Sequence, residues 1–336
     1  MKRVWKVLAW VLVAVLLLLL IAGAAGFFYL QHYLNKLDRT QITGNPELSP
    51  EEIYEEPTVT ATDSVEHIQK AEEEFQNAQA LTRLENSNIK NILLIGSDRR
   101  SKSENGRSDS MILMTLNYDT GNIHLTSLMR AMYVCIPRSD GDTWGMLNWA
   151  YSWGGPQLLI DTIELNFLIS IDQYVVVDFS SFQSAIDILG GVDITLTGTE
   201  AGRLYGGVAG TYHMSGEEAL DYARLRYTDN DFVRTRRQRT VIEALLKKAA
   251  GSDISSLMAM ADEILPLVST NLTNSQIMSY MVKALPMLGN SITQRMLPIE
   301  NESGATYTGK IYVRGCEMYK VDFETNIRTL HQFLQS

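Results

Sequence analysis

The amino-acid sequence predicts a three-layer α/β/α body around one central mixed β-sheet, preceded by one N-terminal transmembrane helix. Two observations predict this fold class. Short apolar runs rich in β-branched residues alternate with longer segments of helical periodicity, which is typical of helices packed on both faces of a sheet. In addition, residues 7–30 form an almost unbroken apolar run, long enough to cross a bilayer as a helix.

The N-terminal charges predict the orientation of that helix. Lys2, Arg3 and Lys6 precede the apolar run, so residues 1–6 are expected to stay in the cytoplasm and the rest to be exported. A cleaved signal peptide is the alternative, because residues 22–26 are all small. The apolar run continues to Leu30, which favours an uncleaved anchor. The chain is therefore expected in the cell membrane as a single-pass protein with an extracellular C-terminal domain.

The composition changes over residues 31–86. Prolines interrupt this segment and glutamates dominate its charge. It is expected to be an acidic stalk, extended at first and helical from about residue 64, that holds the body away from a negatively charged surface. The globular domain is then expected over 87–336.

The body contains a regular succession of expected elements. Expected strands are 91–95, 111–118, 123–128, 173–178, 192–196, 306–312 and 320–323. Expected helices are 157–167, 179–189, 233–250, 254–265, 275–285 and one from residue 324. The turn at 119–122 closes a hairpin, and Gly190 with Gly191 ends a helix.

Composition excludes several classes of function. The formal net charge of −10 argues against nucleic acid as a partner. The five histidines are scattered without metal or triad spacing, and no GxSxG, Walker-type loop or CxxC is present. The two cysteines allow one disulfide, but Cys135 lies in an apolar run and is expected to be an inert buried thiol.

An arginine-rich stretch, DYARLRYTDNDFVRTRRQR at 221–239, is the strongest functional signal. It contains no lysine and holds Arg224, Arg226, Arg234, Arg236, Arg237 and Arg239. A guanidinium presents a planar donor fork that suits phosphate oxygens, whereas an ammonium is a point charge. The periodicity of the following helix puts Arg234 and Gln238 on its apolar stripe, with Arg237 beside it. Buried guanidiniums need an anion, either a bound phosphate or an ion-pair network with Asp229, Asp231 or Glu218.

Three further segments are candidates for a site. Asp98 and Arg100 follow the first buried strand, and Arg107 and Asp109 come after a polar loop. Carboxylates with arginines at the end of such a strand suit a phosphate ester bound to Mg²⁺, with Asp98 and Asp109 for the metal; the alternative is a turn with local ion pairs. Arg130 lies in an apolar stretch. The aromatic residues of MLNWAYSWGG at 146–155 either line a sugar or lipid site or belong to the core.

Read in order, these segments resemble the LytR-CpsA-Psr (LCP) family of bacterial cell-envelope proteins. The matching segments are NILLIGSDRR, RSDSMILMTLNYDTGNIHLTSLMR, MLNWAYSWGG, VVVDFSSFQSAIDILGGVDI and MSGEEALDYARLRYTDNDFVRTRRQR. The resemblance implies the LCP fold and a magnesium-assisted phosphotransferase. Such an enzyme moves a glycopolymer, for example teichoic acid or capsule, from a polyprenyl-pyrophosphate carrier onto a peptidoglycan hydroxyl, typically of N-acetylmuramic acid, at the outer face of the cytoplasmic membrane.

The resemblance also assigns roles to residues. Asp98 and Asp109 match the acids near magnesium. Asp231 matches the acid before the helix and, with Arg130, is the catalytic candidate; its expected role is to assist deprotonation of the acceptor hydroxyl. The arginines that match the pyrophosphate site or its support, with Gln238 beside them, are Arg100, Arg107, Arg130, Arg224, Arg226, Arg234 and Arg237. The family usually has an aspartate after the arginine that matches Arg130, and this chain has Ala131. Loss of that acid would leave Arg130 less well held unless a neighbouring carboxylate compensates.

Two other functions remain open from the sequence. The first is a non-catalytic protein that binds polyprenyl phosphate or senses the state of the envelope, and Ala131 is the residue that keeps it open. The second is a lipid pyrophosphatase, in which water replaces the sugar hydroxyl. In each case the prenyl tail needs a long apolar slot, expected between the sheet and helices such as 179–189.

Overall fold

The computed structural model describes residues 35, 39, 41–49, 53, 65–97, 108–225, 231–251, 263, 265–299 and 309–336. Among these residues, no helix combines the length and apolar character needed to span a bilayer. The expected anchor at 7–30 lies outside the described part of the chain, as does nearly all of the helix expected at 254–265.

A six-stranded mixed sheet forms the centre of the molecule. Its strands are β1 (Ile89–Ser97), β2 (Ser108–Asn117), β3 (Asn122–Leu128), β6 (Gln173–Asp178), β9 (Val268–Thr270) and β10 (Ile292–Leu297). They are ordered β10-β3-β2-β1-β6-β9, with β1 parallel to β6 and β10 parallel to β3. Consecutive residues of β1 such as Ile92 and Leu93 are both buried, as expected for a strand covered on both faces.

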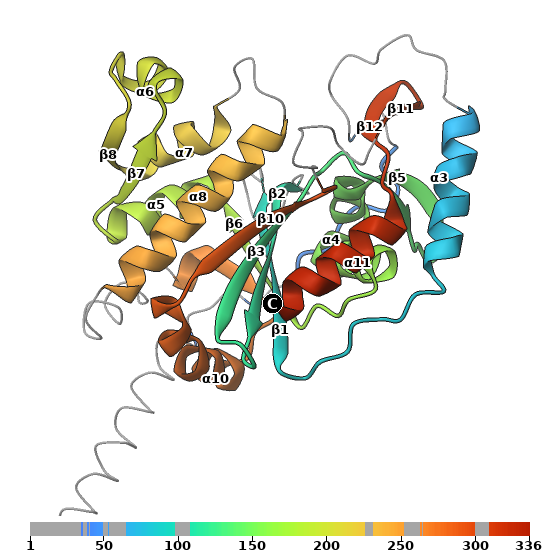
Figure 1. The fold of residues 1–336 in the computed structure, drawn as a ribbon, viewed down its shortest axis with the longest axis horizontal. Helices are drawn as coiled ribbons and strands as arrows, with labels where there is room; N and C mark the ends of the chain where they lie inside the picture. The colour runs from blue at the N-terminus through green and yellow to red at the C-terminus, as the bar shows by residue number, and fades with distance from the viewer. Residues whose placement is uncertain are drawn as a thin grey trace, which may run out of the picture.

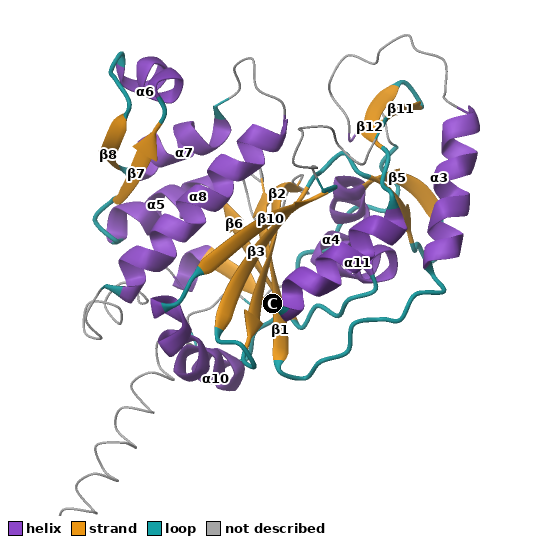
Figure 2. Cartoon of the chain, viewed as in Figure 1, coloured by secondary structure: helices purple, strands orange, loops and turns teal. Residues whose placement is uncertain are grey.

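Helices cover both faces of this sheet, which confirms the three-layer prediction (Figures 1 and 2). One face carries α4 (Leu147–Phe167) and α11 (Phe323–Gln335), and the main hydrophobic core lies beneath them. The other face carries α5 (Phe179–Ile188), α8 (Asp231–Ala250) and α10 (Asn274–Ala284). The helix η2 (Leu285–Gly289) follows α10 and packs against α8 and β3.

Much of the described part of 31–86 packs on the body, although the sequence places this segment in a stalk. The helix α3 (Val65–Ala78) packs against α11, and its Ala71 and Phe75 are buried in the main core. Upstream, the Asn45 N–H donates to the Ser152 carbonyl at 2.8 Å, and the Trp153 indole donates to the Leu48 carbonyl at 2.8 Å. These segments therefore belong to the folded body, because their apolar side chains pack in the main hydrophobic core.

A separate lobe lies at the upper left of Figure 1, beside α5 and α8. It consists of β7 (Val192–Leu196), α6 (Gly198–Tyr205), β8 (Gly210–Met214) and α7 (Gly216–Arg224). The two strands form their own antiparallel sheet, and Ile186, Ile194 and Val241 are members of a second hydrophobic core. The sequence predicts β7 but not its place outside the central sheet. Alternate residues of β7 are exposed, as in a sheet with one covered face.

Short paired strands complete the described fold. The strands β4 (Tyr133–Ile136) and β5 (Thr143–Met146) form one pair, and β11 (Lys310–Val313) and β12 (Cys316–Tyr319) form another. A short helix, η1 (Leu265–Leu267), precedes β9. The strand expected at 320–323 is wrong, because pairing with β11 places it four residues earlier. Helix α4 begins before the expected 157, and Gly155, with a φ of 65°, forms the kink within it.

Candidate functional site

The ends of three central elements meet at one edge of the sheet. The parallel strands β1 and β6 end side by side, with Ser97 paired to Asp178. The neighbouring β2 starts at this same edge, so Asp109 lies at its beginning. Helix α8 begins with Asp231 and packs against β2 and β3. Carboxyl ends of strands at such a change of direction are where open α/β sheets bind ligands.

Four charged side chains connect β2, the end of β3 and α8; we call them the charged cluster. The Arg130 Nη1 lies 3.0 Å from the Asp109 Oδ1, and its Nε lies 3.8 Å from the Asp231 Oδ2. The other Asp231 oxygen, Oδ1, lies 2.9 Å from the Arg234 Nη1. Arg234 is buried, whereas the other three are partly exposed. The cluster therefore presents two guanidiniums held in place by two carboxylates.

The residue after Arg130 bears on the departure from the family pattern. Ala131 is buried, and its carbonyl accepts the N–H of Tyr319 at 2.8 Å. The Arg130 carbonyl accepts the N–H of Asn148 at 3.2 Å, which fixes the backbone here. Two carboxylates from other elements, those of Asp109 and Asp231, face the guanidinium. Neighbouring carboxylates therefore hold the Arg130 guanidinium in this chain.

Tyr319, at the end of β12, is a neighbour of the cluster that the sequence does not reveal. Burial, followed by the negative charge of Asp231, raises the pKa of its phenol to about 12. The ring meets Phe232 edge to face, with 5.3 Å between ring centroids. The phenol is therefore neutral at physiological pH, and β12 is tied to the beginning of α8.

A second arginine of α8 is paired inside the protein. The Arg237 Nε lies 2.7 Å from the Glu200 Oε1, with both side chains buried, and its Nη1 donates to the Leu225 carbonyl at 3.0 Å. Burial alone would raise the pKa of Glu200, but hydrogen bonds from Arg237 and Thr197 outweigh it and lower that pKa. Arg237 therefore supports the site by joining α8 to the lobe and to the end of α7.

Glu200 is a residue that sequence reasoning missed. A signal was present, because Thr197 and Glu200 have the spacing of a capping box, and the structure contains that box at the start of α6. The pairing of Glu200 with Arg237 spans 37 residues and leaves no local pattern. The alternative partner Glu218 instead caps α7 through Ser215. Of the three acids that the sequence offered for an ion-pair network, Asp231 is confirmed, and Asp229 lies outside the described residues.

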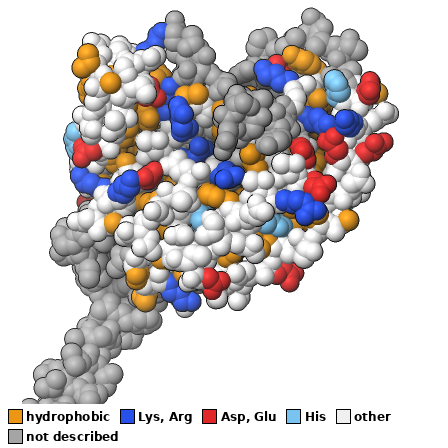
Figure 3. Space-filling model, viewed as in Figure 1, with side chains coloured by type: hydrophobic (Ala, Val, Ile, Leu, Met, Phe, Trp, Pro, Cys, Tyr) orange, Lys and Arg blue, Asp and Glu red, His pale blue; other side chains and the backbone are white. Residues whose placement is uncertain are grey.

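The remaining arginines of the stretch have different environments. The Arg224 guanidinium lies over the Phe179 ring, 4.7 Å from its centroid. Arg239 is buried, and its Nε donates to the Gln294 Oε1 at 3.1 Å. Figure 3 shows Lys and Arg side chains along the boundary between the lobe and the rest of the body. Four predicted site residues lie outside the described residues: Asp98, Arg100, Arg107 and Arg226.

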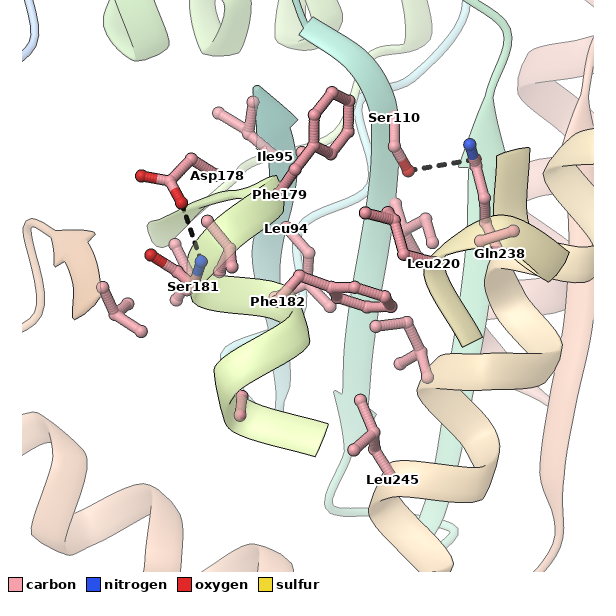
Figure 4. A pocket seen from close by; sticks show the side chains of 18 of the residues that line it. Leu94, Ile95, Ser110, Asp178, Phe179, Ser181, Phe182, Leu220, Gln238 and Leu245 are labelled. Atoms are coloured by element: carbon pink, nitrogen blue, oxygen red, sulfur yellow. Dashed lines mark hydrogen bonds between the residues drawn. The ribbon is translucent and has the colours of Figure 1, made fainter. Parts of the chain in front are cut away.

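An apolar cavity of about 250 Å³ lies between the sheet and the helices α5, α7 and α8. Leu94, Phe182 and Leu245 contribute to its apolar walls (Figure 4). Its polar lining includes Ser110, whose hydroxyl donates to the Gln238 Oε1 at 3.0 Å. Arg224 and Asp178 also reach its lining. An apolar cavity therefore occupies the place where the sequence predicts one.

Two other sequence-based interpretations can be compared with the structure. Trp149, Tyr151 and Trp153 are buried in the main core, so these rings pack the body and do not line a sugar site. Cys135 and Cys316 are both buried and are not joined in a disulfide, and burial raises the pKa of the Cys135 thiol to about 11. The inert thiol predicted for Cys135 agrees with this environment.

The described residues contain no group of three or more His, Cys, Asp or Glu side chains that could hold a metal.

Comparisons with known proteins give the family. The model of the LytR_cpsA_psr family matches residues 54–329. A Bacillus cereus protein named polyisoprenyl-teichoic acid–peptidoglycan teichoic acid transferase TagU is 36% identical over 191 residues, which cover 55% of this chain and 61% of that protein. A Bacillus anthracis protein of the same name is 34% identical over 209 residues, 60% of this chain and 66% of its own length. Each match thus spans less than two thirds of the relative.

The crystal structure of TagV from B. subtilis gives a TM-score of 0.59 at 27% identity, covering 74% of this chain and 98% of that one. The shared fold agrees with the match of the family model over most of the chain. This protein is a member of the LytR_cpsA_psr family.

Proposed function

We propose that this chain is a magnesium-assisted phosphotransferase that moves a glycopolymer from a polyprenyl-pyrophosphate carrier onto a peptidoglycan hydroxyl, that of N-acetylmuramic acid. The expected anchor at 7–30 would bring the extracellular domain to the carrier in the cytoplasmic membrane. The names of the Bacillus relatives support the donor and acceptor classes, since both describe transfer of teichoic acid to peptidoglycan.

The observation that carries the proposal is the joining of the charged cluster to the apolar cavity. Ser110, in the cavity lining, directly follows Asp109 of the cluster, and Gln238 lies one helical turn after Arg234. A prenyl pyrophosphate has this same polarity, with a long apolar tail next to a compact anionic group. The tail fits the apolar walls, and the pyrophosphate fits the guanidiniums of Arg130 and Arg234.

The arrangement supports phosphoryl transfer by positioning and charge neutralisation. Arg130 and Arg234 donate hydrogen bonds to phosphate oxygens, where negative charge develops as the acceptor oxygen approaches phosphorus. The N-terminus of α8 adds a favourable dipole and backbone N–H donors at the same place.

Asp231 is the group proposed to take the proton of the acceptor hydroxyl, since Arg130 and Arg234 orient its carboxylate. The acceptor oxygen then forms a bond to the glycan-linked phosphorus. The bond between that phosphorus and the bridging pyrophosphate oxygen breaks, and polyprenyl monophosphate leaves.

Magnesium is the ion proposed to assist the reaction, with Asp98 and Asp109 as the carboxylates that would hold it. Asp109 is the described member of the proposed pair, and Mg²⁺ is often held by one or two carboxylates together with substrate phosphates. When bound, the ion would neutralise charge on the phosphoryl oxygens. Asp109 also holds Arg130, so one carboxylate would serve both the metal and the arginine.

The test uses the full chain in detergent with a lipid-linked glycan, peptidoglycan oligomers and Mg²⁺. Glycan joined covalently to peptidoglycan supports the transferase. Release of free phosphorylated glycan would identify a pyrophosphatase instead. A donor that stays bound and unchanged would identify a binding protein and contradict both enzymatic readings.

Two arginines of α8 provide a matched pair of variants for that assay. Arg234 is buried against Asp231, whereas Arg236, two residues later, is exposed. We expect Arg234→Ala to lower kcat by about 10²–10³-fold, as for loss of a charge-stabilising donor, and Arg236→Ala to retain the wild-type rate. Arg234→Lys keeps the charge without the planar fork and should fall in between. Thermal melting of each variant separates misfolding from lost chemistry. Wild-type transfer by a folded Arg234→Ala variant would contradict the assignment.

A further inference from the structure

The segment just after the expected anchor is tied to one edge of the body. The Asn274 Nδ2 donates to the Asn35 Oδ1 at 2.7 Å, and the Arg39 Nε donates to the Leu272 carbonyl at 3.0 Å. Arg39 also donates to the Asn274 side chain. Two residues early in the chain thus bind the same short segment more than 230 positions later.

That segment is itself held firmly by the central sheet. It begins two residues after the end of β9, and Leu272 is buried. The Asn271 Oδ1 accepts the N–H of Tyr174 in β6 at 2.9 Å, and the Thr270 hydroxyl donates to the Tyr174 carbonyl. The position of Asn35 is therefore fixed relative to the sheet.

The length of the intervening chain limits how far this edge can lie from the membrane. The apolar run ends at Leu30, five residues before Asn35. Five extended residues reach at most about 18 Å. A stalk that raises the body well above the bilayer is incompatible with this tie, so residues 272–274 lie close to the lipid surface if 7–30 spans the membrane.

The surface next to this segment suits a lipid headgroup layer. Helix α10 begins at Asn274, and its Val282 is 71% exposed beside the exposed Lys283. Lys247, near the end of α8, is also exposed, although it pairs with Glu243, and α8 packs against η2, which follows α10. Figure 1 places α10 at the lower end of the sheet, away from the lobe. Apolar and basic side chains together favour contact with an anionic bilayer.

The cavity runs from the charged cluster toward α10. Gln238 lies beside its polar lining, and Leu245 lies seven residues later along α8, about 10 Å nearer the C-terminal end of that helix. Val177, near the end of β6, lines the cavity. Gln173, at the start of β6 near Leu272, lies four residues before Val177, or about 13 Å along the strand. The apolar end of the cavity therefore points toward the α10 edge, and the charged cluster lies at the opposite end.

We propose that residues 272–274 and α10 form a membrane-facing edge that lies on the bilayer surface. The prenyl tail then enters the cavity from the lipid, and the pyrophosphate is lifted to the charged cluster on the side away from the membrane. This orientation rests on the proposed function, because it needs both the anchor and a prenyl-linked donor.

Three exposed valines allow the orientation to be measured. Val282 on α10, Val208 in the lobe and Val65 on α3 are 71%, 78% and 60% exposed. Each is changed to cysteine in the full chain and labelled with an environment-sensitive fluorophore; the two native thiols are buried. The proteins are reconstituted into phosphatidylcholine–phosphatidylglycerol vesicles that contain lipids with a nitroxide headgroup. We expect quenching at position 282 to exceed that at 208 and 65 several-fold. Equal quenching at the three positions, stronger quenching at a control position, or failure to float with the vesicles would each overturn the orientation.

A second variant tests the tie itself. Arg39→Ala combined with Asn274→Ala removes the side-chain hydrogen bonds that hold Asn35 and Arg39, and neither residue belongs to the charged cluster. Quenching at position 282 should fall toward the level of the controls, and retention of full quenching would show that the tie does not set the orientation. The transfer assay reports separately: transfer without selective quenching overturns only the orientation, and selective quenching without transfer overturns only the proposed function.

Discussion

The buried pair of Glu200 and Arg237 allows a quantitative test of how the lobe supports the site. Glu200→Gln keeps the size of the side chain and removes its charge, so it leaves the Arg237 guanidinium buried without a carboxylate. Breaking one partner of a buried pair costs about 3–5 kcal/mol. At roughly 1.4–2 °C per kcal/mol for a chain of this size, the melting temperature should fall by about 4–10 °C.

The chain contains a matched control for this change. Glu218 occupies the same capping-box position at the start of α7 that Glu200 occupies at the start of α6, but its side chain is only partly buried and its hydrogen bond to Ser215 is exposed to solvent. Glu218→Gln should therefore cost only about 0.3–1.5 kcal/mol, the usual value of a cap. Calorimetry and urea unfolding give both numbers. An equal loss for the two variants would refute the claim that Arg237 depends on Glu200.

The pH dependence and a double variant sharpen the result. The pKa of Glu200 is lowered in the folded state, so the stability it contributes is present above its unfolded value of 4.5 and is lost as pH falls through the folded pKa. The difference between wild type and Glu200→Gln should therefore shrink below pH 4.5. The double variant Glu200→Gln with Arg237→Gln should lose less free energy of unfolding than the two single variants lose in sum, because no charge then remains buried without a partner.

Three further predictions concern the site and the cavity. Ala131→Asp should lower the melting temperature by burying a third carboxylate near Arg130 and should leave the transfer rate within about twofold, because Asp109 and Asp231 already hold that arginine; a large gain in rate in the transfer assay would contradict this. Leu245→Trp should fill the cavity and raise KM for the lipid donor, with an unchanged melting temperature; steady-state kinetics with an unaltered KM would show that the tail binds elsewhere. Cys135 should resist iodoacetamide at pH 8 until the chain unfolds, because burial raises its pKa to about 11; mass spectrometry that finds the native thiol modified would exclude this.

The parts of the fold that the sequence predicts are those set by local patterns. The strand β6, QYVVVD, has three consecutive valines at its centre, and α5 is bounded by Asp178, which caps it, and by two glycines. Their bounds agree closely with the predicted ones because each signal lies within the element. The α6–α7 lobe was missed because β8, GTYHM, is short and only partly apolar. Its pairing with β7 depends on contacts across the lobe.

The site likewise contains residues that the sequence reveals and residues that it does not. Guanidinium groups and acids at the ends of strands and helices are visible in the sequence, and the structure brings Asp109, Arg130, Asp231 and Arg234 together. Their supporting residues leave no such signal. Tyr319 reaches the cluster from the far end of the chain, and its effect comes from burial beside a carboxylate. Long-range contacts of this kind have no spacing that periodicity could reveal.

The second hydrophobic core has a consequence for how the protein moves. Helix α8 contributes Val241 to the core of the lobe and Phe232 to the main core, so this one helix joins two packing units. Units with separate cores open locally at different free energies. The lobe can therefore loosen over the apolar cavity while the first turn of α8, with Asp231, stays packed on the main core. The boundary between the two units would then open along the side of the cavity that α7 lines.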